Sequence, residues 1–182
     1  METMALNLKP QDVVVLVKLC GYRTVSRPPY SLIAADLGMS QSEINGSVKR
    51  LQSAKLVHGK ELGELPILAA VEEFLIHGVK YAFPAERGHL VRGMPTSYAA
   101  EPLSAVIAAG DDPIPVWPDP LGEKRGLSLL PLYGSVPEAA RRDPDLYARL
   151  AMLDAIRDGR ARERKIAETK LLESLRQLNG ES

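Results

Sequence analysis

One segment of the chain carries polar side chains at spacings suited to a helix that enters DNA. Between residues 40 and 51, Ile44, Val48 and Leu51 repeat at intervals of four and three residues, which places them on one helical face. The residues that lie largely off that face are polar, small or basic: Ser40, Gln41, Ser42, Asn45, Gly46, Lys49 and Arg50. A helix seated on its apolar face leaves the opposite face free for the major groove.

Other residue types that could do chemistry are scattered. The three histidines are far apart in the sequence and lack the spacing that puts two ligands on one helical face. The single cysteine, Cys20, allows no internal disulfide and no cysteine-based zinc site. No nucleophile, Walker or dinucleotide motif occurs. The sequence therefore predicts no enzyme, no metal and no cofactor, although a polar pocket that brings together Arg92, Asp111 or His89 would favour an enzyme.

The polar segment is framed by strong local signals for two helices and a turn. Pro10 and Asp12 open a helix that ends before Gly21, and a second helix is expected from a cap at Ser31 to Leu37. Gly38 allows a left-handed turn. The Ser40 and Glu43 pair predicts a capping box for the next helix, which should run to about Ala54 and lead into a short strand at residues 56–57.

This order of small, glycine, capping and apolar positions resembles the DNA-binding segment of MarR-like winged-helix transcriptional regulators over residues 8–60. The resemblance implies that Gln41, Ser42, Asn45, Gly46 and Lys49 face DNA. It implies that Lys49 and Arg50 reach phosphates or a guanine edge, and that Asn45 reads adenine. The sequence departs from the family after Val57, where residues 58–63 are short for a wing, and Lys60 is the wing's remaining basic residue.

Charge is distributed unevenly along the chain. Residues 1–60 hold eight Lys or Arg and four Asp or Glu. The remaining residues hold 15 of the chain's 23 basic residues and 19 of its 23 acidic residues. The overall net charge is zero, but the N-terminal part is positive, as expected of a surface that meets nucleic acid.

The rest of the chain predicts an α+β architecture, with a winged-helix or helix-turn-helix unit first, then a smaller α+β region and C-terminal helices. We expect a helix over 65–76 that ends at Gly78 and strands near 79–83, 88–92 and 123–132. Residues 110–122 should be irregular and anchored by Trp117, and helices should span 145–158 and 160–178. The expected domains are 5–62, 63–135 and 136–180, the last a candidate dimerisation segment.

Two features of the C-terminal segment leave alternatives open. Residues 157–165 hold five basic residues, which could contact DNA, dock on an acidic partner or form a solvated helix face. Leu171, Leu175 and Leu178 form a stripe that either joins two copies of the chain or packs on its own domain.

The function expected from these patterns is sequence-specific binding of double-stranded DNA by a homodimer that regulates transcription. The alternative is a protein-partner module, such as the antitoxin and autoregulator half of a toxin–antitoxin pair. The N-terminus lacks the pattern of a signal peptide and no apolar run is long enough to cross a bilayer, so a cytoplasmic location without membrane contact is expected.

Overall fold

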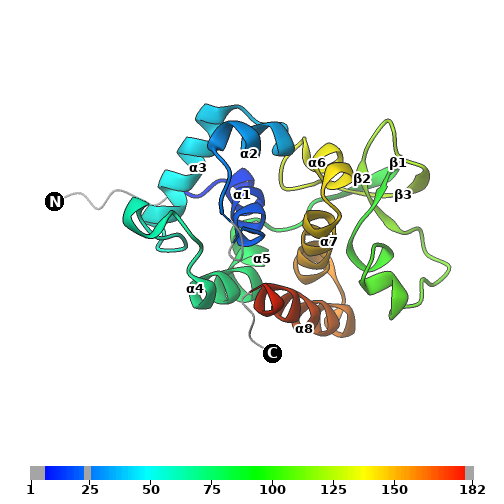
Figure 1. The fold of residues 1–182 in the computed structure, drawn as a ribbon. Helices are drawn as coiled ribbons and strands as arrows, with labels where there is room; N and C mark the ends of the chain where they lie inside the picture. The colour runs from blue at the N-terminus through cyan, green and yellow to red at the C-terminus, as the bar shows by residue number, and fades with distance from the viewer. Residues whose placement is uncertain (1–6, 23–25, 179–182) are drawn as a thin grey trace.

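The chain begins and ends with helices and has a small sheet between them in the sequence, which makes the fold α+β. The computed structural model describes residues 7–22 and 26–178. Figure 1 shows the N-terminal helices on one side of the molecule, the strands on the opposite side, and the C-terminal helices between and below them. None of the helices in these ranges is long and apolar enough to span a bilayer.

Three helices form the N-terminal part: α1 (Pro10–Cys20), α2 (Tyr30–Leu37) and α3 (Gln41–Ser53). The apolar run of α1 is buried on all sides, as expected, because α3 packs on one side of it and α7 on another. Helix α2 begins at Tyr30 with Pro29 at the N-cap, so the expected cap at Ser31 is wrong. Gly38 then adopts a left-handed backbone with φ 65°, which turns the chain from α2 into α3.

The short strand expected at residues 56–57 is reduced to one antiparallel bridge between Val57 and Pro66. Two backbone hydrogen bonds flank it, from His58 N to Leu65 O at 2.8 Å and from Ile67 N to Leu56 O at 2.9 Å. The loop between them contains a 3-10 turn, Lys60–Leu62.

The next helical stretch runs further than the sequence predicts. Helix α4 (Leu68–Glu73) continues through a π-helical turn, Phe74–Gly78, into α5 (Val79–Ala82), so the strand expected at 79–83 is wrong. Gly78 does not end the helix. Its missing side chain leaves room for the ring of Phe74, since a Cβ there would lie 2.7 Å from a ring carbon.

Three strands form a small closed mixed sheet: β1 (Arg87–Pro95), β2 (Pro115–Pro118) and β3 (Lys124–Leu129). Strand β1 pairs antiparallel with both others, and β2 pairs parallel with β3. The segment between β1 and β2 holds two 3-10 turns, Ser97–Ala99 and Leu103–Ala105. The irregular segment expected at 110–122 therefore contains a strand, and Trp117, which is buried, lies on it.

The C-terminal part consists of α6 (Val136–Arg142), which the sequence did not predict, α7 (Pro144–Asp158) and α8 (Ala161–Gln177). Leu171 and Leu175 on α8 are buried within the chain, where α8 packs against α7 and α4. Two of the three leucines of the stripe therefore belong to the protein's own core. That core is continuous from α1 through α4 to α8 and crosses the expected boundaries near residues 62 and 135.

Candidate nucleic-acid interface

The outward face of α3 gathers the polar residues that the sequence singled out. Ser40, Gln41, Ser42, Asn45 and Lys49 are exposed, and Gly46 is half-buried between them. Ile44, Val48 and Leu51 are buried on the opposite face, so the expected division of the helix is confirmed. The one carboxylate of α3 is Glu43, which is half-buried and whose two oxygens accept hydrogen bonds at the start of the helix. The fully exposed side chains of α3 offer hydrogen-bonding groups and one basic group, Lys49.

The first turn of α3 is held by a capping box and by a residue from far along the chain. The Ser40 hydroxyl accepts from Glu43 N at 3.1 Å, and Glu43 accepts from Ser40 N at 2.7 Å. The Tyr133 hydroxyl donates to the other Glu43 oxygen at 2.6 Å. These bonds, with that from Tyr133 the strongest, lower the pKa of Glu43. Both oxygens of this carboxylate thus accept hydrogen bonds that stabilise the start of α3.

The turn before α3 is supported from the same distant region. Ser135 donates its hydroxyl proton to Leu37 O at 2.5 Å, and the Arg142 guanidinium donates to Ala35 O at 2.8 Å. The first bond satisfies a carbonyl at the C-terminal end of α2 that has no partner within the helix, and the second adds to the bond that Ala35 O accepts from Gly38 N at 3.4 Å. The α6 region thereby fixes the angle between α2 and α3.

Arg50 is used inside the protein. Its guanidinium forms two hydrogen bonds to the carboxylate of Asp12, at 2.7 and 2.8 Å, and that carboxylate is fully buried. Asp12 also accepts from Lys9 N at 2.8 Å at the start of α1. The pair joins α1 to α3, so Arg50 anchors the helix while its neighbour Lys49 stays exposed.

The turn after the Val57–Pro66 bridge is organised by a buried carboxylate that the sequence did not single out. Glu64 accepts from the Tyr30 hydroxyl at 2.5 Å and from the Arg27 guanidinium at 2.9 Å. The guanidinium also lies 4.8 Å above the Tyr30 ring. Burial, together with the bond to Glu64, raises the pKa of Tyr30. Gly63 and Glu64 both have left-handed backbones. The sequence around Glu64 does not predict this conformation for it.

These parts meet in a hollow of about 410 Å³ beside α3. Its lining includes Gln41 and Asn45 from α3, Lys60 from the turn, and Arg27 and Tyr30 from the start of α2. The structure therefore brings Lys60 beside the N-terminal half of α3, whereas Lys49 lies further along the same helix.

The other charged candidates are divided among different surroundings. Arg157 is buried and bonds Asp154 at 2.7 Å, so the basic run at 157–165 is divided between core and surface. A larger cavity beside the sheet is lined by Arg87 and Asp112, and Arg92, Asp111 and His89 are not among its lining residues. Within the described residues, no group of three or more His, Cys, Asp or Glu could hold a metal ion.

No family model, no curated protein and no solved structure matches this chain, so its function has to be inferred from the geometry of its own residues.

Proposed function

We propose that the chain is a winged-helix protein that binds double-stranded DNA in a sequence-specific way and regulates transcription, with α3 in the major groove. The observation that carries the proposal is the outward face of α3, where Gln41, Ser42, Asn45 and Lys49 are exposed to solvent and the one carboxylate, Glu43, is bonded at the start of the helix. The resemblance of residues 8–60 to MarR-like regulators points to the same face.

The positions along α3 suggest how the contacts divide. Gln41, Ser42 and Asn45 lie in its first two turns, which is the part of such a helix that reaches base edges. Asn45 has the amide pair that suits adenine, and Gly46 allows close approach. Lys49, one turn further along, is suited to a phosphate. Arg50 is left out of the proposed contacts because Asp12 already occupies its guanidinium.

The bridge and turn after α3 take the place of the wing. The loop is too short to reach along a groove, but it carries Lys60, which is exposed, to the edge of the hollow beside α3. The Glu64 cluster with Arg27 and Tyr30 holds that turn in place. Lys60 is therefore the proposed wing contact, directed at the phosphate backbone.

We include a homodimer in the proposal because one α3 spans only a few base pairs. Two copies that read half-sites about 34 Å apart would gain affinity and specificity. The buried leucines of α8 do not supply the contact between copies, so the two-fold axis lies at another surface. Light scattering of the protein with and without DNA would report the stoichiometry.

Binding to the DNA upstream of the protein's own gene, measured at several salt concentrations, tests the proposal. Lys49→Ala and Lys60→Ala should each weaken binding and lower the salt dependence by about one unit of slope, since each removes one phosphate contact. Lys124→Ala, an exposed lysine on β3, is the matched control and should leave both quantities unchanged. If the salt dependence of binding is the same in all three variants as in the parent, the assignment of Lys49 and Lys60 to phosphate contacts is overturned.

Base reading is tested separately. Asn45→Ala should lower affinity for the upstream site by about 1–3 kcal/mol and leave binding to random DNA and the salt slope nearly unchanged. Equal losses on both DNAs would mean that Asn45 contacts the backbone instead of a base.

A further inference from the structure

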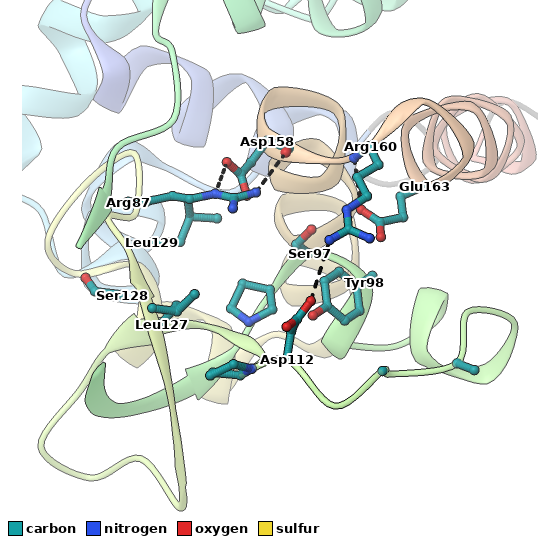
Figure 2. A pocket seen from close by; sticks show the side chains of 14 residues that line it. Arg87, Ser97, Tyr98, Asp112, Leu127, Ser128, Leu129, Asp158, Arg160 and Glu163 are labelled. Carbon is teal, nitrogen blue, oxygen red and sulfur yellow. Dashed lines mark hydrogen bonds and ion pairs between the residues drawn. The ribbon is translucent and has the colours of Figure 1, made fainter. Parts of the chain in front are cut away.

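A cavity lies beside the small sheet, on the side of the molecule away from α3 (Figure 1). It measures about 460 Å³, within the range typical of small-molecule sites. Three parts of the chain enclose it: strands β1 and β3, the loop from Ser97 to Pro115, and the junction of α7 and α8. Figure 2 shows Leu127 and Leu129 on one side of the hollow and Tyr98 with Arg160 across from them.

Two ion pairs at this cavity differ in strength. Arg87 bonds Asp158 through Nε at 2.7 Å and also reaches the Asp158 carbonyl at 3.3 Å, and the aspartate is largely buried. The second pair, between Arg160 and Asp112, is looser: its atoms are 3.6 Å apart and each side chain is about four-fifths exposed. Such an exposed pair contributes roughly 0–1 kcal/mol, so its two charges can exchange partners at little cost.

The cavity also contains hydroxyl groups without partners. Within the described residues, no hydrogen bond involves the hydroxyls of Ser97, Tyr98 or Ser128, all of which belong to lining residues. Ser97 is buried and has a left-handed backbone with φ 55°, a conformation that costs a non-glycine residue free energy. Burial and the nearby carboxylates of Glu163 and Asp112 raise the pKa of Tyr98, so its hydroxyl stays protonated and can donate.

The charges select a class of ligand. A simple anion would be attracted by Arg160 but repelled by the carboxylates of Asp112 and Glu163. A simple cation would be attracted by those carboxylates but repelled by the arginines. A ligand with one charge of each sign can replace the loose pair without changing the charge balance. Arg160 is also the N-cap of α8, a 17-residue helix, and its backbone N–H already donates to the Glu163 carboxylate at 3.0 Å. A ligand carboxylate therefore meets the guanidinium of Arg160 and not the end of the helix.

We propose that this cavity binds a free α-amino acid, whose carboxylate pairs with the guanidinium of Arg160 and whose ammonium group pairs with the carboxylate of Asp112. The side chain of the amino acid then extends between Leu127, Leu129 and Pro115, within reach of the unpartnered hydroxyls. The Arg87–Asp158 pair forms part of the fixed wall. This site is separate from the DNA surface on α3 and does not depend on that proposal.

The test is a thermal-shift screen of the full chain with each standard L-amino acid at millimolar concentration, followed by calorimetric titration of the best one. We expect at least one amino acid to raise the melting temperature and to bind. Its N-acetyl derivative, which lacks the ammonium, and its amide, which lacks the carboxylate, should each bind about tenfold or more weakly.

Variants of the loose pair locate the binding. Arg160→Gln and Asp112→Asn should each weaken binding about tenfold or more. The exposed neighbours Arg162→Gln and Asp111→Asn, which change the same charges outside the cavity lining, should have no effect. Because all four side chains are exposed, circular dichroism should show an unchanged fold. The proposal is overturned if no amino acid binds, if the acetylated or amidated ligand binds as well, or if Arg160→Gln and Asp112→Asn bind like the parent.

Discussion

The three N-terminal helices and the small sheet are held in different ways. Neighbouring residues set the frame of the N-terminal unit: Gly38 turns the chain, and Ser40 and Glu43 cap α3 three residues apart. The sheet depends on contacts between distant residues. Asp154 on α7 accepts from Thr96 at 2.8 Å and from the Trp117 indole at 2.6 Å, and both bonds are buried.

This difference decides where each region can carry function. In the N-terminal unit, local signals, apolar packing and the bonds of Glu43 and Arg50 fix the helix. The exposed side chains of Gln41, Ser42, Asn45 and Lys49 take no part in those bonds. In the sheet, many polar side chains are committed to internal bonds, and the uncommitted groups lie in the cavity at its edge. The same contrast predicts that the sheet is the more sensitive region to loss of one charged side chain.

The largest effect is expected for Asp154→Ala. The change leaves the buried Arg157 guanidinium without its carboxylate and removes the partner of Trp117 and Thr96. Breaking such a buried pair costs about 3–5 kcal/mol of unfolding free energy. Denaturant unfolding followed by fluorescence measures it at the sheet itself, because Trp117 is the sole tryptophan.

Asp145→Ala, an exposed position on the same helix, serves as the control and should cost less than about 1 kcal/mol. The double variant Asp154→Leu/Arg157→Met should recover part of the loss, because it removes the uncompensated charge. A single variant as stable as the control would show that the sheet does not depend on this cluster.

The same contrast explains what the sequence could predict. Helices α1, α3, α7 and α8 follow from apolar spacing and from caps close in the sequence. Strand β2 does not, because its prolines are typical of irregular segments. It pairs through carbonyls, which proline retains: Pro115 O accepts from Thr96 N at 3.0 Å.

The candidate interface, like the fold, was predictable only where its features depend on residues close in the sequence. The exposed face of α3 follows from helical periodicity, which is a local property. The Arg50–Asp12 pair spans 38 positions, and the supporting residues Tyr133 and Ser135 come from beyond the sheet. No local pattern marks such contacts, so Arg50 looked as available for DNA as Lys49.

A smaller effect is expected at the turn between α2 and α3. Gly38→Ala places a side chain on a left-handed backbone and brings its Cβ to about 3.1 Å from the Cβ of Ser135. The expected loss is about 1–2 kcal/mol of unfolding free energy. Gly134→Ala is the matched control, since a Cβ there meets nothing within 4 Å. Equal melting temperatures for the two variants would mean that the turn tolerates side chains and that local backbone geometry does not set the angle of α3.

The smallest effect, and the most specific for α3, is the pH dependence that comes from Glu43. Bonds from Tyr133 and Ser40 lower its folded pKa, so this carboxylate stabilises the fold above its unfolded pKa of about 4.3. The contribution is lost as pH falls through the folded pKa. Glu43→Gln keeps the hydrogen-bond acceptor but not the charge, and should cost up to about 1 kcal/mol at pH 7.

That difference between parent and Glu43→Gln should shrink as the pH falls below about 4.3 and through the lowered folded pKa, as measured by urea unfolding at a series of pH values. Tyr133→Phe removes the bond that lowers the pKa of Glu43 most, so in that variant the loss should be smaller and should be complete at a higher pH than in the parent. A difference that stays constant from pH 7 to pH 3 would show that the charge of Glu43 does not stabilise the start of α3. The capping box would then act through hydrogen bonding alone, and the N-terminal unit would owe its stability to packing and backbone geometry instead of charge.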